Sequence, residues 1–109
     1  MVQIQSTKDI YYHLYHRLSH LEQEHFYTLY LDMKNQILST QRIYIGTLNQ
    51  TSIHPREIFK NAVKLSAASM IFVHNHPSGD STPSLSDYKA TEQLEASAKI
   101  MGIQVIDHV

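Results

Sequence analysis

Two histidines, a serine and an aspartate are spaced so that they could form a metal site. His74 and His76 follow the short apolar run at residues 70–73, and Asp87 comes eleven residues after His76, with Ser84 three residues before it. Residues two apart on a strand point to the same side, so both imidazoles could face one ion if the strand geometry continues.

The residue types favour a catalytic zinc over a structural one. Two imidazoles and one carboxylate supply three ligands, which leaves the fourth tetrahedral position for water. Zinc lowers the pKa of that water to roughly 7 and polarises a carbonyl group, so hydrolysis is the natural chemistry. The chain has no cysteine, so any metal must be held by histidine and carboxylate. We predict one zinc ion at His74, His76 and Asp87.

Each part of this pattern alone is weak. A His-x-His pair near a strand end is more often structural than metal-binding, and Ser84 and Asp87 could do no more than cap a helix. The prediction depends on the spacing of all four residues together.

The residues around the candidate site predict an α/β architecture. Residues 6–9 and 84–87 both have the form of a capping box, Pro55 suits a first helical position, and Gly102 suits a helix end. The expected elements are a helix at 7–21, strands at 26–31 and 37–45, a helix from 55 to about 67, a strand at 70–73, a helix from 84 to 101 and a strand at 103–109. The second helix should cross between parallel strands, and the turn before the third should return Asp87 to the strand end.

Composition excludes several classes of protein. The chain has 109 residues, which predicts one domain over 1–109, and its 42% apolar and 17% charged residues are typical of a folded protein. A net charge of −1 without any Lys/Arg run does not support a nucleic acid partner. The first residues lack a signal-peptide core and no long apolar run follows, so we expect a cytoplasmic protein without a membrane partner.

The spacing of the four polar residues resembles a known family. His74-Asn75-His76, seven residues, Ser84, two residues and Asp87 match the JAMM motif of the JAB/MPN metalloproteases. The strings GTLN at 46–49, HPRE at 54–57 and HNHPSGD at 74–80 resemble the RadC family, historically labelled as DNA-repair proteins. The resemblance covers nearly the whole chain. It implies a JAB/MPN-like, cytidine-deaminase-like mixed sheet flanked by helices.

The resemblance also implies roles for individual residues. His74, His76 and Asp87 would bind zinc, and Ser84 would stabilise the tetrahedral oxyanion during hydrolysis of a peptide or isopeptide bond. A glutamate upstream would act as general acid and base. Residues 23–26 read Gln-Glu-His-Phe, which fits the expected context, so we assign this role to Glu24, with Glu22 as its competitor.

Other functions fit parts of the sequence. Inactive relatives use the same fold as a protein-interaction scaffold, although they typically lack ligands that are all present here. A metal-dependent enzyme acting on nucleic acid would agree with the repair label. Zinc deaminases, however, need a Cys-x-x-Cys pair that this chain lacks, and two-metal nucleases need clustered carboxylates. A protein or peptide of unknown identity is the expected substrate.

Proteins that resemble this chain commonly continue past the position of Val109 into further strands, and many carry a helix-hairpin-helix segment ahead of it. We therefore expect a sheet truncated at its C-terminal side, with an edge strand at 103–109 that seeks a partner. A homo-oligomer formed through this edge is a reasonable expectation.

The remaining histidines have ordinary explanations. His13, His16 and His20 share a helical stripe beside the apolar face, so we expect them to face solvent. His25 should point to the opposite side of its strand from Glu24. His54 precedes the Pro55 helix, where an imidazole can cap backbone amides. Asp107 and His108 could orient a metal-bound imidazole without binding the metal themselves, or they could simply be polar residues at a sheet edge, and the sequence does not decide.

Overall fold

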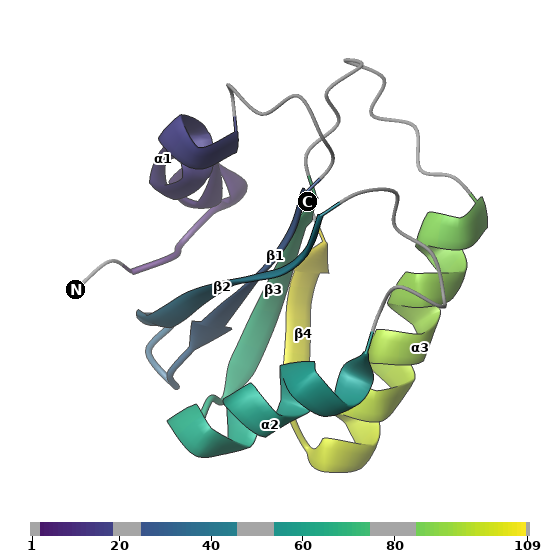
Figure 1. The fold of residues 1–109 in the computed structure, drawn as a ribbon. Coiled ribbons are helices and arrows are strands. Elements are labelled where there is room, and N and C mark those ends of the chain that lie inside the picture. The colour runs from purple at the N-terminus through teal and green to yellow at the C-terminus, as the bar shows by residue number, and fades with distance from the viewer. Residues whose placement is uncertain (1–2, 19–24, 46–53, 75–84, 109) are drawn as a thin grey trace.

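A computed structural model describes residues 3–18, 25–45, 54–74 and 85–108. It contains three helices, α1 Thr7–Leu18, α2 Pro55–Leu65 and α3 Leu85–Met101, and four strands, β1 His25–Leu31, β2 Ile37–Ile45, β3 Ser69–His74 and β4 Gln104–His108 (Figure 1). Within these ranges, no helix is both long enough and apolar enough to cross a membrane.

The four strands form one mixed sheet in the order β2-β1-β3-β4. β1 is antiparallel to both β2 and β3, while β3 and β4 are parallel. The strands joined by α2 therefore run in the same direction, as the sequence predicts, but β1 lies between them. The adjacent parallel pair is instead joined by α3. The expected mixed sheet flanked by helices is confirmed.

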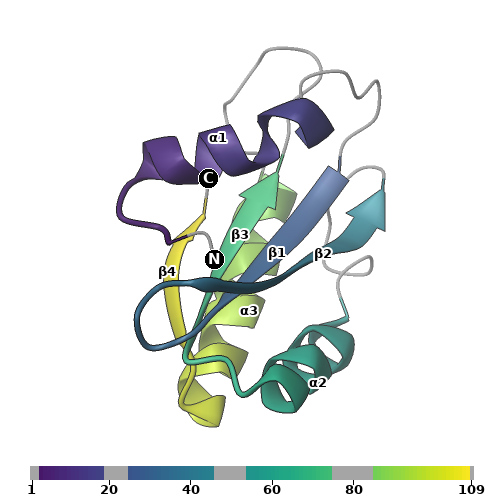
Figure 2. The same cartoon turned by 90° about the vertical axis from the view of Figure 1, so that its left-hand side faces the viewer.

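Each face of the sheet is covered by different helices because strand residues alternate between the faces. Figure 2 shows α1 in front of the sheet and α3 behind it. On the α2/α3 face the core cluster comprises Phe26, Tyr30, Ile58, Phe59, Ala62, Met70, Phe72, Leu94, Ala98 and Ile103. On the α1 face it comprises Ile4, Ile10, Leu14, Tyr27, Leu29, Leu31, Ile71 and Val73. β1 and β3 contribute to both clusters, so they form the centre of the fold.

The helix ends largely follow the expected signals. The Asp9 carboxylate accepts hydrogen bonds from the backbone N–H groups of Gln5 at 2.7 Å and Ser6 at 3.2 Å, as in a capping box. Gly102 ends α3 with a φ of +71°, a conformation that favours glycine.

The imidazole of His54 does not cap α2, although capping is one role that its position allows. His54 does occupy the residue before α2, but its side chain makes no capping hydrogen bond and is exposed to solvent. Its backbone carbonyl oxygen instead accepts the N–H of Glu57 at 3.0 Å. Pro55 lacks a backbone N–H, so the start of α2 has one donor fewer for a capping side chain to satisfy.

The prediction that His13 faces solvent is wrong. His13 is half-buried, and its Nε2 lies 3.0 Å from the Thr40 hydroxyl of β2. His13 directly precedes Leu14, which is buried, so the side of α1 next to its apolar stripe also reaches the sheet. The side chains of His16 and His20 lie outside the described residues.

β4 forms one edge of the described sheet and contains a register irregularity. Met70 pairs with Val105 but the next residue, Ile71, pairs with Asp107, so Ile106 is an extra residue in β4. A bulge of this kind disfavours further strand pairing at an edge. The homo-oligomer expected from the sequence stays a prediction.

Tyr30 links β1 to α2 within the core. Its hydroxyl donates a hydrogen bond of 2.8 Å to the carbonyl oxygen of Ile58, and the side chain is fully buried. We expect Tyr30→Phe to lower the free energy of unfolding by about 1 kcal/mol, the usual net value of such a bond. Urea denaturation near pH 8 measures this difference.

Wild type and Tyr30→Phe should also differ in how their free energy of unfolding depends on pH. Burial raises the pKa of Tyr30 to about 12, from 10, against a smaller lowering by a hydrogen bond with Asn61. Between pH 10 and pH 12, Tyr30 ionises in the unfolded protein but stays neutral in the folded protein. Its contribution to the free energy of unfolding is therefore fully present below pH 10 and is lost as the pH rises toward 12. The advantage of wild type over Tyr30→Phe should shrink above pH 10. A constant difference from pH 8 to pH 11 would contradict this assignment.

Candidate metal centre

One end of the sheet gathers the elements that carry the predicted site. β2, β3 and β4 run in the same direction and end there, while β1 begins there, so that His25 pairs with Ile45 and Phe26 with His74. In Figure 1, α3 begins to the right of the sheet, at about the height at which β3 and β4 end. Segments that are far apart in the sequence therefore meet at one end of the sheet.

Two of the predicted site residues have described backbone positions. His74 is the last residue of β3, and Asp87 is the third residue of α3. Glu24, His76 and Ser84 lie outside the described residues, as do the side chains of His74 and Asp87. Among the residues that the structure describes, no group of three potential metal-ligating side chains occurs.

Two aromatic rings lie beneath this end of the sheet on the α2/α3 face. Phe26 and Phe72 stack with their ring centroids 5.5 Å apart and their planes at 29°, and both are buried. Phe26 is the register partner of His74. The strand positions next to position 74 on this face are therefore apolar and buried, and an apolar surrounding strengthens electrostatic interactions.

The start of β1 is also packed on the opposite face. His25 is 6% exposed, and its ring stacks on Tyr27 with the centroids 6.3 Å apart. Tyr27 belongs to the cluster under α1, so His25 lies on the face away from Phe26, as expected from alternation. Burial on both faces fixes the backbone at His25, the residue bonded to Glu24.

Helix α3 lies on the same face as the two phenylalanines. Leu94 and Ala98 are 1% exposed and belong to the cluster that contains Phe26 and Phe72. Asp87 precedes Leu94 by seven residues, which is close to two helical turns, so its backbone position falls on the stripe of α3 that packs on the sheet.

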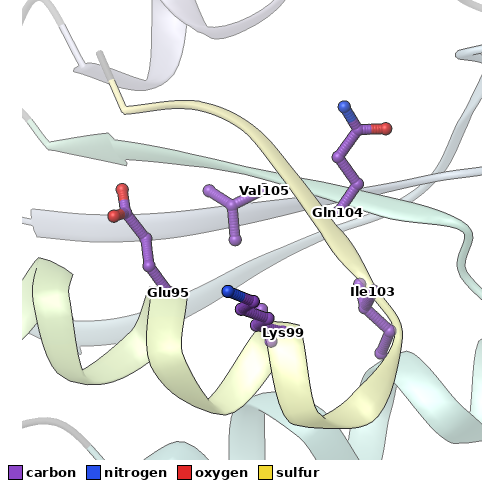
Figure 3. A pocket seen from close by; sticks show the side chains of 6 residues that line it. Glu95, Lys99, Ile103, Gln104 and Val105 are labelled. Carbon is purple, nitrogen blue, oxygen red and sulfur yellow. The ribbon is translucent and has the colours of Figure 1, made fainter.

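A groove of about 380 Å³ lies at the other end of β4. It runs between the last turns of α3 and the start of the strand, and it is lined by Glu95, Ala98, Lys99, Ile103, Gln104 and Val105 (Figure 3). Its strand residues begin β4, whereas His108 ends β4 beside the predicted site. The groove is therefore separate from the candidate metal centre.

Zinc suits the donor set that the sequence places here. Two imidazoles and one carboxylate are ligands that zinc accepts, and three protein ligands leave room for water. The two buried phenylalanine rings beside the end of β3 are apolar groups of the kind that limit solvent access around a metal site. His74, His76 and Asp87 are thus chemically suited to zinc.

The described elements form a four-stranded mixed sheet between one helix and two others, an α/β arrangement that is consistent with a domain of the JAB/MPN type. The chain matches the RadC-like JAB domain over residues 4–109. It therefore belongs to the RadC-like JAB domain family.

Relatives from several organisms are similar to 84–97% of the chain. A UPF0758 protein of Methanosarcina mazei is 49% identical over 106 residues, which cover 97% of this chain and 46% of that protein. A UPF0758 protein of Bacillus cereus is 48% identical over 106 residues, covering 97% and 47%. One of Syntrophomonas wolfei is 55% identical over 92 residues, covering 84% and 39%. The chain thus spans about half the length of these relatives or less.

Proposed function

We propose that this domain is a zinc-dependent hydrolase of the JAMM type that cleaves an amide bond in a protein or peptide. The observation that carries the proposal is the pairing of Phe26 with His74 in the antiparallel β1/β3 ladder. This pairing aligns two motif segments that are almost fifty residues apart in the sequence.

Strand alternation supports a common face for the two segments. In β1, Phe26 and Tyr30 lie on the α2/α3 face, and Glu24 is the preceding member of this series. In β3, Met70 and Phe72 lie on the same face, and His74 is the next member of their series. If the alternation continues past the strand ends, position 24 approaches positions 74 and 76 on the face that α3 covers.

The proposed ion would be held from two elements. His74 and His76 would supply imidazoles from the end of β3, and Asp87 would supply a carboxylate from the first turn of α3. Zinc, when bound, supplies a Lewis acid that acidifies water and polarises a carbonyl group.

The other residues act on protons and developing charge. The Glu24 carboxylate would take the proton of the attacking water and then deliver it to the leaving amine nitrogen. The Ser84 hydroxyl would donate a hydrogen bond to the substrate carbonyl oxygen as it becomes negative. Ser84 also directly precedes α3, so capping this helix is an alternative role for it.

The proposal is tested by measuring bound metal and amide cleavage together. Protein stripped of metal and reloaded with zinc should bind one ion per chain and cleave members of a peptide library. One bound ion without cleavage of any peptide would favour the interaction scaffold. Cleavage of a nucleic acid substrate but not of peptides would favour a nucleic acid enzyme.

A further inference from the structure

The solvent-facing side of α2 carries a stripe of positive charge. Arg56, Lys60 and Lys64 are four residues apart in turn, and all three are exposed. Because an α-helix rises about 1.5 Å per residue, these cations follow the helix axis at intervals of about 6 Å and span about 12 Å. The residues that α2 buries pack into the core on its other side. We call Arg56, Lys60 and Lys64 the basic stripe.

The basic stripe concentrates charge that the composition conceals. The chain has nine Lys and Arg residues and a net charge of −1, and three of the nine belong to the stripe. Three other residues separate each of its cations from the next, so the sequence shows no Lys/Arg run. The helical turn nevertheless brings them onto one side of α2. A chain of nearly neutral charge therefore has a locally positive surface.

No contact within the described part of the chain neutralises the basic stripe. Among the described residues, no carboxylate forms an ion pair with any of its three side chains. Like charges four residues apart destabilise a helix, and a cation in the first turn, such as Arg56, opposes the helix dipole. Only Lys64, in the last turn, is favourably placed for that dipole. The stripe therefore weakens α2, which favours a role in binding over a role in folding.

Two neighbours of the stripe indicate what kind of partner it fits. Val63 is 60% exposed and lies one turn from Lys60 and next to Lys64. A protein segment can bring carboxylates and an apolar side chain to this surface together, whereas a phosphate backbone brings charge alone. Glu57, which is also exposed, lies one turn before Lys60 and would repel phosphates there. The surface thus fits an acidic protein segment better than a nucleic acid.

We propose that the basic stripe docks an acidic, amphipathic helical segment of a partner protein. Carboxylates four residues apart on such a helix repeat at the same interval of about 6 Å, so they can face all three cations at once. An apolar residue of the segment contacts Val63. Exposed ion pairs are individually weak and are screened by salt, so the affinity is modest and depends on salt.

The docking surface is separate from the candidate metal centre. In Figures 1 and 2, α2 lies toward the end of the sheet where β3 begins, whereas His74 is the last residue of β3. The inference does not depend on the proposed function, because docking of this kind requires no metal.

The test uses a synthetic helical peptide with glutamate at every fourth residue and leucine beside it. The matched peptide has glutamine in place of each glutamate. By fluorescence anisotropy at low salt, wild type should bind the acidic peptide at least about tenfold more tightly than the neutral one, and added salt should weaken binding. The variant Arg56→Gln/Lys60→Gln/Lys64→Gln should lose about tenfold in affinity for the acidic peptide. Its Tm should stay the same or rise, because like-charge pairs are removed.

The matched control removes the same charge elsewhere. Lys8→Gln/Lys89→Gln/Lys99→Gln changes three exposed lysines on the other two helices, and it should bind the acidic peptide within about threefold of wild type. In NMR spectra of wild type, the acidic peptide should shift the backbone amide signals of α2 more than those of α1.

Three results would overturn the proposal. The first is equal affinity for the acidic and neutral peptides, or no measurable binding of either. The second is an equal loss in the stripe variant and the control, because net charge alone would then explain binding. The third is tighter binding of a single-stranded oligonucleotide than of the acidic peptide, lost in the stripe variant, which would assign the stripe to nucleic acid.

Discussion

The metal-free double variant His74→Ala/His76→Ala should bind zinc on the order of 10⁴-fold more weakly than wild type, because each ligand of a zinc site contributes roughly 3 kcal/mol of binding free energy. Two of the three proposed ligands are lost together. Asp87 alone retains little affinity for a borderline-soft ion. Isothermal titration calorimetry with zinc measures the change.

The control for this experiment removes two other imidazoles. His16→Ala/His20→Ala eliminates the same number of potential ligands, and the sequence predicts that both residues face solvent. His13 is unsuitable for the control because it contacts Thr40. The control should bind zinc like wild type. Equal affinities for wild type and the His74/His76 variant would exclude a zinc site at the end of β3.

Glu24→Gln should lower the rate of amide hydrolysis by about 10²- to 10⁴-fold, the usual contribution of a general acid and base. Glutamine has nearly the same shape but cannot take a proton from water. Zinc affinity should fall by less than about tenfold, because Glu24 is not a proposed ligand and glutamine keeps a side chain of the same shape that can hydrogen-bond. Initial rates on a peptide substrate, measured at equal zinc occupancy, give the comparison.

Glu22→Gln is the matched control because it makes the same chemical change two residues earlier. It should cleave the peptide at nearly the wild-type rate. If Glu24→Gln retained full activity while Glu22→Gln lost it, the general base would be Glu22. Full activity in both variants would remove this segment from the mechanism.

Local signals in the sequence predict most of the helices and strands. Pro55 at the start of α2, the Asp9 carboxylate near the start of α1, and Gly102 after α3 act within a few residues of their own positions. Such effects depend on neighbours in the chain, so they can be recognised from composition and spacing. The continuous apolar run of β3 likewise predicts a strand buried on both faces.

Contacts between distant segments account for what sequence reasoning missed. His13 is half-buried because α1 packs on the sheet beside Thr40 of β2, a partner 27 residues away. The extra residue Ile106 can be recognised only from the pairing of β4 with β3, because no residue type in β4 indicates a bulge. The pairing of His108 with Phe72 could therefore not be derived by counting alternate residues along the strand.

In the candidate site, too, some features follow from the sequence alone and others depend on contacts between distant segments. The spacing of His74, His76, Ser84 and Asp87 is a property of the sequence alone. The alignment of the Glu24 segment with the end of β3 depends on the Phe26 to His74 register, which joins segments 48 residues apart. Apolar patterning alone leaves more than one register open.

An anomalous-scattering map at the zinc edge, from crystals of the zinc-loaded protein, tests the central claim most directly. We predict one strong peak at the end of β3, within about 2.0–2.2 Å of a nitrogen atom of His74, a nitrogen atom of His76 and an oxygen atom of Asp87. A zinc peak held by other histidines, such as His16 and His20, with none at the end of β3, would contradict it.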